Sequence, residues 1–134
     1  MLIRPANQTD IAVLLEHDNW VSKKVIAKKV DSGQVYVVFD SDTFVGWLRY
    51  GLFWDNTPYM NMLYLIEEYR GKGIGRALVA YWEKEMKTIG YKCVLTSSAQ
   101  TEYAQHFYRK LGYRAIGSFT LDHEPLEIIF EKQI

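Results

Sequence analysis

One short segment combines glycines with positive charges in a way that suits an anionic ligand. It reads Arg70-Gly71-Lys72-Gly73-Ile74-Gly75-Arg76 and lies between a strand-like pattern and a helical one. Glycine adopts positive φ without strain and lets backbone N–H groups approach a ligand closely. The first N–H groups of the following helix would add partial positive charge, and the three basic side chains would add full charges. The loop therefore fits a pyrophosphate group.

The spacing of these glycines excludes two nucleotide-binding motifs. A P-loop requires G-x-x-x-x-G-K-[ST], but Lys72 is followed by Gly73. The dinucleotide fingerprint G-x-G-x-x-G fails at its last position, where Arg76 stands. That fingerprint also belongs to the first βα unit of a parallel sheet, whereas here an antiparallel meander of strands precedes the loop. The alternative to an anion site is a plain glycine turn with solvated basic side chains.

Hydrophobic periodicity and turn residues predict the elements that position this loop. Helices are expected over about 8–17, 22–33, 73–89 and 104–111; Asn7, with Asp10 at N3, caps the first and Ser22 caps the second. Strands are expected over about 2–4, 35–39, 44–53, 59–66, 91–96, 113–119 and 126–131. The order β-α-α-β-β-β-α-β-α-β-β predicts an α/β (α+β) fold, in which a mixed, mostly antiparallel sheet has helices on both faces.

Helical spacing also groups the apolar side chains of two helices. Val25, Ile26 and Val30 should share one face of the second helix. In the third helix the residues that recur at helical spacing are Ile74, Leu78, Tyr81 or Trp82, Glu85 or Met86, and Ile89.

Composition and charge narrow the classes of protein. The 134 residues carry 16 basic and 16 acidic side chains, and this balance argues against a nucleic acid as the main partner. The length fits a single domain over 1–134, and no apolar run is long enough to span a membrane. The one cysteine, Cys93, suits a small core residue in a reducing cytoplasm. His17, His106 and His123 are scattered, so we expect no metal site.

Two segments resemble the signatures of the GNAT superfamily of N-acetyltransferases. Arg70-Gly71-Lys72-Gly73-Ile74-Gly75 is similar to the family motif [RQ]-x-x-G-x-[GA]. Ala104-x-x-Phe107-Tyr108-x-x-Leu111-Gly112-Tyr113 resembles the second signature. The predicted element order is similar to the GNAT fold over nearly the whole chain.

The resemblance implies a role for each matching residue. The loop from Arg70 to Arg76 would bind the pyrophosphate of acetyl-CoA, as it does in the family. Leu63, Tyr64 and Leu65 would form the strand edge that pairs with the pantetheine arm, and a main-chain N–H near Leu65 would stabilise the oxyanion of the tetrahedral intermediate. Tyr108 matches the tyrosine that protonates the departing thiolate of CoA.

Two positions depart from the family pattern. Thr101 stands where the family often has an asparagine that bonds the pantetheine arm. Met60, Asn61 and Met62 occupy the positions where many members carry a carboxylate that acts as general base. Without a base, deprotonating a lysine-like amine at pH 7 costs about 4.6 kcal/mol, whereas an α-amine costs about 1.1 kcal/mol. A water relay or an amine of lower pKa would then be favoured.

The resemblance implies transfer of an acetyl group from acetyl-CoA to a primary amine by direct attack. The alternative is a noncatalytic domain that binds or senses acyl-CoA. The acceptor could be a small molecule or a peptide, and a homodimer is expected only by analogy with the fold. The family builds its acceptor pocket near His17–Trp20 and Trp54–Asn56, so Asp18 or Asp55 beside an aromatic wall could hold a cationic amine.

Overall fold

The computed structural model describes all residues from 1 to 134. Its strands are β1 (Leu2–Pro5), β2 (Val35–Asp40), β3 (Thr43–Phe53), β4 (Thr57–Leu65), β5 (Cys93–Ala99), β6 (Arg114–Phe119) and β7 (Glu127–Gln133). Its α-helices are α1 (Ile11–His17), α2 (Lys23–Asp31), α3 (Ile74–Ile89) and α4 (Ala104–Lys110), with short 3₁₀ turns η1 (Gln8–Asp10) and η2 (Glu67–Tyr69). The predicted order of strands and helices is confirmed, as is the mixed, mostly antiparallel sheet.

The strands follow the order β1-β2-β3-β4-β5-β7-β6 in one seven-stranded sheet, and the chain divides into two compact units. The first unit comprises Met1–Tyr50 and Met62–Trp82, and the second comprises Gly51–Asn61 and Glu83–Ile134. Strands β3 and β4 therefore contribute residues to both units.

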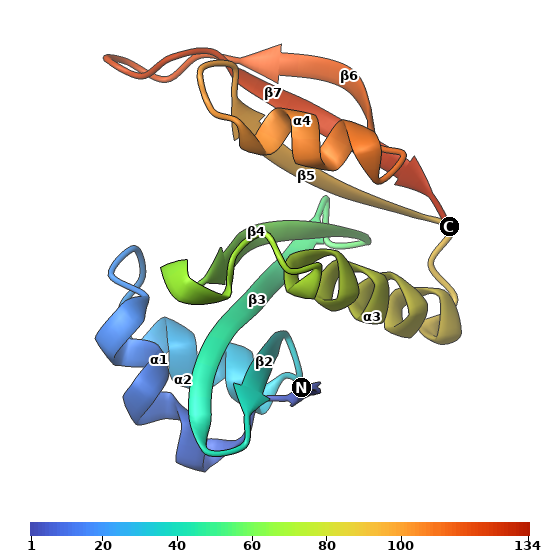
Figure 1. Ribbon diagram of the computed structural model, residues 1–134. Coiled ribbons are helices and arrows are strands. Elements are labelled where there is room, and N and C mark those ends of the chain that lie inside the picture. The colour runs from blue at the N-terminus through green and yellow to red at the C-terminus, as the bar shows by residue number, and fades with distance from the viewer. The chain divides into compact units, whose positions relative to one another are not determined.

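In the first unit, β2 is buried on both faces. Strand β2 pairs antiparallel with β1 and β3. Val35 and Val37 belong to a core cluster with Trp47 of β3 and with buried residues of the helices, Leu14 of α1 and Ile26 and Val30 of α2. Tyr36 points to the other face, where its ring lies 5.4 Å from that of Tyr81 on α3. Because β2 is buried on both faces, its sequence is a nearly continuous apolar run. Helices α1 and α2 lie side by side next to β3 (Figure 1).

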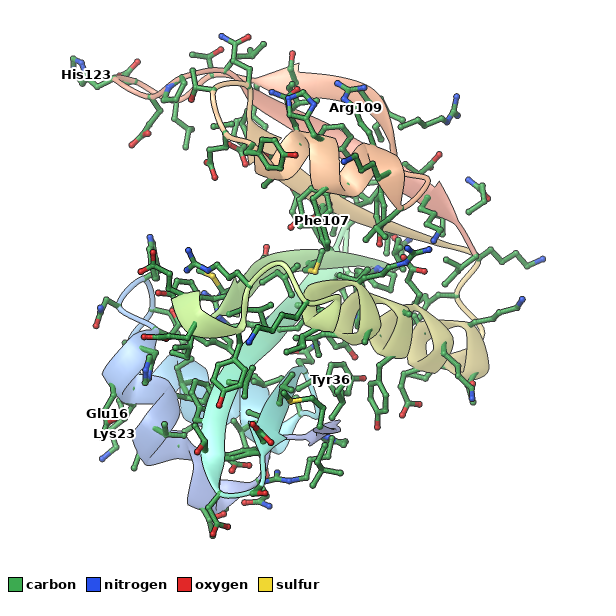
Figure 2. All side chains as sticks on the ribbon, viewed as in Figure 1. Glu16, Lys23, Tyr36, Phe107, Arg109 and His123 are labelled. Carbon is green, nitrogen blue, oxygen red and sulfur yellow. The ribbon has the colours of Figure 1, made fainter.

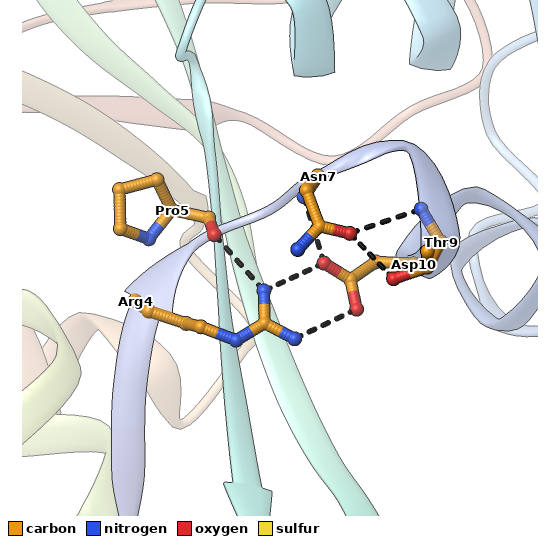
Figure 3. A network of polar contacts seen from close by, with 5 residues as sticks. All are labelled: Arg4, Pro5, Asn7, Thr9 and Asp10. Carbon is orange, nitrogen blue, oxygen red and sulfur yellow. Dashed lines mark hydrogen bonds and ion pairs between the residues drawn. The ribbon is translucent and has the colours of Figure 1, made fainter.

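A polar network fixes the start of the first helical segment (Figure 3). Asn7 accepts a hydrogen bond from the backbone N–H of Thr9, and Asp10 accepts one from the backbone N–H of Asn7 at 2.7 Å, which completes the predicted capping box. Arg4 donates to both carboxylate oxygens of Asp10, at 2.7 and 3.0 Å. Burial alone would raise the pKa of Asp10, but the bonds from Arg4 and Asn7 outweigh it and hold that pKa below its ordinary value. The helix begins with a 3₁₀ turn rather than an α-turn.

In the second unit, β5, β7 and β6 form an antiparallel group, and the start of β4 pairs in parallel with β5. Helix α4 lies across one face of the β5–β7 pair (Figure 1). Tyr108 of α4 packs its ring against those of Phe130 and Tyr113, with centroids 6.1 and 5.7 Å away. Every residue of β6 is exposed, as expected of a strand at the edge of a sheet.

Some details of the helices and strands differ from their expected pattern. Val25 and Ile89 are 39% and 63% exposed, whereas Ile26 and Val30 of α2 and Leu78, Trp82 and Met86 of α3 are buried. Val25 and Ile89 each lie in a terminal turn of their helix. Strand β5 begins at Cys93 and runs to Ala99, three residues past the expected end. Cys93 is only partly buried. None of the helices is sufficiently long and apolar to cross a membrane.

Candidate active site

The glycine loop of the first unit connects η2 to α3. Gly71 and Gly73 have φ of 73° and 83°, in the left-handed region that disfavours any side chain. The backbone N–H of Ala77 donates to the carbonyl oxygen of Gly73 at 3.1 Å, which is the first hydrogen bond of the helix. The N–H groups of residues 74–76 therefore precede the helical ladder and can face an anion. Gly75 does not need positive φ, because it already lies inside α3.

The three cations of this loop differ in what they contact. Arg70 donates from Nε to the carbonyl oxygen of Leu65 at 2.9 Å, and its guanidinium lies 5.1 Å from the ring centroid of Tyr64. Lys72 places Nζ 5.8 Å from the ring centroid of Tyr69. Arg76 is exposed on the first turn of α3. Arg70 thus ties the loop to the end of β4, while Arg76 lies exposed at the start of α3.

The end of β4 is held closely against β3 by a glycine. A Cβ atom at Gly46 would overlap the carbonyl oxygen of Tyr64 and come within 2.7 Å of the Leu65 side chain. The N–H of Ile66 donates to the carbonyl oxygen of Val45 at 2.8 Å. Leu63 is half-buried, as are Tyr64 and Leu65. Sequence reasoning missed Gly46, although a glycine inside a long strand often marks close backbone approach.

Tyr108 lies on α4 in the second unit and is only 7% exposed. The pKa of Tyr108 is raised to about 12, mainly by burial. A hydrogen bond to the Thr96 side chain lowers this pKa, and the charges of Glu102 and Glu127 raise it. The phenol is therefore protonated at neutral pH and can donate its proton. Thr96 is itself buried, and its hydroxyl donates to the carbonyl oxygen of Met60 at 3.0 Å.

Thr101 lies between β5 and α4 and lines a pocket of about 340 Å³ in the second unit. The same pocket is lined by Glu102, Phe119, Leu121 and Glu127. Sequence reasoning did not single out Glu127. Its signal in the sequence is weak, because one acidic residue inside the apolar run from Leu126 to Phe130 is typical of any half-exposed strand.

The structure removes Asp18 as a candidate for binding a cationic acceptor. Its carboxylate is buried and accepts hydrogen bonds from Arg49 Nε at 2.9 Å and from the indole N–H of Trp47 at 3.2 Å. A carboxylate that is already paired and desolvated has no capacity left for a second cation. Asp55 is exposed, with φ of 61°, next to Trp54, which is 80% exposed.

The three histidines lie apart in their own surroundings. His17 contacts the carbonyl oxygen of Val13 at 3.1 Å, and the ring of His106 lies 5.3 Å from that of Tyr103. His123 lies at the outer end of the segment between β6 and β7 (Figure 2). No group of three or more histidine, cysteine, aspartate or glutamate residues is arranged to hold a metal ion.

The mixed sheet and the glycine loop at the start of α3 were compared with known families and solved structures. The chain belongs to the acetyltransferase (GNAT) family, whose model matches residues 5–113 and so extends through both units. Comparison with curated proteins gave no match.

Solved structures share the fold at low sequence identity. Ard1 from Thermoplasma volcanium is 14% identical, with a TM-score of 0.84 over 99% of this chain and 97% of that one. The PaiA N-acetyltransferase from Thermoplasma acidophilum, in complex with coenzyme A, is 22% identical, with a TM-score of 0.82 over 99% and 98%. The ribosomal-protein-S18-alanine N-acetyltransferase from Escherichia coli is 17% identical, with a TM-score of 0.82 over 99% and 93%. At these identities the likeness is one of fold.

Proposed function

We propose that the chain is an N-acetyltransferase that moves an acetyl group from acetyl-CoA to a primary amine by direct attack. The observation that carries the proposal is the left-handed loop of Gly71 and Gly73 at the start of α3, in a chain of the GNAT family. Structural relatives described as N-acetyltransferases, one of them in complex with coenzyme A, support it. In this proposal residues 1–134 act as a single domain.

The loop would bind the pyrophosphate of acetyl-CoA. The N–H groups at the start of α3 offer hydrogen bonds, and Lys72 and Arg76 add positive charge. Leu63, Tyr64 and Leu65 would pair with the pantetheine arm, and a main-chain N–H near Leu65 would stabilise the oxyanion. Thr101 would contribute a hydroxyl contact to the same arm.

Tyr108 would act as the general acid. The sulfur of CoA gains negative charge as the C–S bond breaks, and a phenol can transfer its proton to it. The burial that raises the pKa of Tyr108 keeps the phenol protonated throughout the neutral range. No covalent acyl-enzyme is needed, and the pKa of the one cysteine, Cys93, is raised by burial, which disfavours a nucleophilic thiolate.

The acceptor is an amine on a small molecule or a peptide. We place the enzyme in the cytoplasm, because a lone cysteine without a disulfide partner suits a reducing compartment. We also propose a homodimer, by analogy with other proteins of this fold, in which dimers are common.

The test measures thiol release from acetyl-CoA across a panel of amines that includes spermidine, kanamycin, an alanyl peptide and a lysine-containing peptide. Tyr108→Phe should bind acetyl-CoA nearly as well as wild type and turn over about 10²–10⁴-fold more slowly. The matched control is Tyr103→Phe, since Tyr103 precedes the same helix but is 75% exposed. Acetyl-CoA binding with no thiol release from any amine would instead indicate a noncatalytic acyl-CoA-binding domain.

A further inference from the structure

Glu127 is the carboxylate that the second unit holds in a defined position beside its pocket. Its Oε2 accepts a hydrogen bond from the Ser97 hydroxyl at 2.7 Å, and the two residues lie on neighbouring antiparallel strands. Glu127 is half-buried and lines the pocket of about 340 Å³, so its other oxygen can meet a ligand there. Glu102 and Glu124 line the same pocket.

Strand register places Glu127 and Tyr108 on opposite faces of the β5–β7 pair. Thr96 is paired with Phe130, and the ring of Phe130 contacts that of Tyr108, so these residues mark the face covered by α4. Side chains alternate between faces along a strand. Ser97 follows Thr96 by one residue on β5, and Glu127 precedes Phe130 by three residues on β7. Both offsets are odd, so both side chains point to the other face.

Direct attack needs two different protein groups. The attacking nitrogen and the departing sulfur are separate atoms of the tetrahedral intermediate, and one loses a proton while the other gains one. The sequence offers no carboxylate at the position in β4 where many family members carry a base, because Met60, Asn61 and Met62 stand there. The structure supplies a carboxylate from β7 instead.

We propose that Glu127 is the general base for the acceptor amine, held in place by Ser97. The inference rests on the proposed function. An ammonium acceptor first loses a proton to solvent, and the neutral nitrogen then attacks the thioester carbon. As the C–N bond forms, one N–H proton passes to the Glu127 carboxylate. The C–S bond breaks, and the sulfur takes the proton of Tyr108. Exchange with solvent then removes the proton from Glu127 and restores that of Tyr108.

The surroundings of Glu127 suit an approaching cation. Glu102 and Glu124 add negative charge around the pocket, and Phe119 and Leu121 add apolar surface. Tyr59 lies on the same face of the sheet as Ser97. Burial raises the pKa of Tyr59, its hydrogen bond to Ser97 lowers that pKa, and the charge of Glu127 raises it. Tyr59 is thus neutral near pH 7, and the pocket holds no lysine or arginine in its lining. Among the three glutamates, Glu127 is the one fixed by a neighbouring strand.

The experiment compares Glu127→Gln with the matched control Glu131→Gln, which removes the same charge from the same strand at a position outside the pocket, beside the exposed Arg114. Glutamine keeps an oxygen that can accept the bond from Ser97 but cannot take a proton. We expect Glu127→Gln to lower kcat about 10²–10⁴-fold with unchanged affinity for acetyl-CoA, and Glu131→Gln to keep a kcat close to wild type. Ser97→Ala, which leaves the carboxylate but frees it, should lower kcat by less than Glu127→Gln does.

Chemical rescue separates a base from a structural residue. Glu127→Ala leaves space for a small carboxylate, so added formate should restore part of its turnover, and formate should not raise the activity of Glu131→Ala. A wild-type kcat for Glu127→Gln, or a defect in Glu127→Ala that formate does not repair, would overturn the inference. If the wild type releases no thiol with any amine, the proposed function fails and this inference fails with it. If the wild type and Glu127→Gln are equally active, the inference about Glu127 fails and the proposed function stands.

Discussion

The hydroxyl of Thr96 donates a hydrogen bond to the carbonyl oxygen of Met60 at 3.0 Å, and the two residues are register partners in the parallel pair of β4 and β5. A side chain thereby bridges two strands whose backbones already pair. The hydroxyl oxygen also contacts the phenol of Tyr108. One buried threonine thus connects the strand pair to the residue assigned as general acid.

Replacing Thr96 by valine should lower the free energy of unfolding by about 1–3 kcal/mol. Valine has nearly the same shape, but the buried carbonyl of Met60 loses a donor. Thr96→Ser keeps the hydroxyl and should recover most of this loss. Urea unfolding at neutral pH measures both variants, and equal stability of Thr96→Val and wild type would show that the bond contributes nothing.

Stability should fall at alkaline pH because of buried tyrosines. The pKa of Tyr108 is raised to about 12 in the folded chain, against about 10 in an unfolded one. Between these two values the unfolded state loses its proton and the folded state keeps it, so the stability present below pH 10 is lost as pH rises towards 12, by about 2–3 kcal/mol from Tyr108. The pKa of Tyr113 is raised by burial and by Glu83, and acts in the same direction.

Unfolding measured at several values between pH 9 and 11 checks this expectation. Tyr108→Phe should show a shallower decline than wild type, and the exposed Tyr103→Phe should show the same decline as wild type. Tyr108, the proposed general acid, should also remain protonated up to pH 10, so a fall in kcat below that pH must come from another group.

Gly73→Ala should abolish the thermal stabilisation that acetyl-CoA gives to the wild type. A side chain is strained at φ of 83°, so the loop must rearrange and withdraw its N–H groups. The matched control is Gly33→Ala, because Gly33 also has positive φ, 72°, and open space around its Cβ position, but follows α2. Both variants should lose some stability, and only Gly73→Ala should lose binding. Normal binding by Gly73→Ala would contradict the role of the loop.

Arg70 and Arg76 should respond differently to salt. Arg76→Ala should weaken acetyl-CoA binding through lost charge, and added salt should shrink the difference from wild type because it screens exposed charges. Arg70→Ala should keep a defect at high salt, since it also loses the bond to the Leu65 carbonyl and the contact with Tyr64. Titration of acetyl-CoA at low and high ionic strength measures both, with the exposed Lys84→Ala as control. Identical salt dependence of the two variants would refute the distinction.

The buried pair of Asp18 and Arg49 should be costly to break. Asp18→Asn leaves the Arg49 guanidinium without its counter-charge and should lower the free energy of unfolding by about 3–5 kcal/mol. The double variant Asp18→Asn with Arg49→Met should be more stable than Asp18→Asn alone. Asp55→Asn, at an exposed position, should be close to wild type in the same denaturant titration.

Features carried by neighbouring residues could be predicted from the sequence. The capping box depends on Asn7 and Asp10, three residues apart, and the loop depends on glycines two residues apart. Features that depend on distant partners could not. Asp18 was a candidate for holding a cationic amine because Arg49, its partner, lies 31 residues away and could not be assigned to it. Glu127 gained its significance only when folding placed it beside Ser97, 30 residues earlier.

The contact between Gly46 and the backbone of Tyr64 affects how genetic variation in this chain should be read. Any replacement at position 46 would push the end of β4 away from β3. A survey of inactive mutants would therefore collect changes at codon 46 alongside changes at codons 71 and 73. Such a survey would score Gly46 as a ligand contact, although its effect would reach the ligand only through the position of another strand. Affinity measured beside stability would distinguish the two kinds of codon.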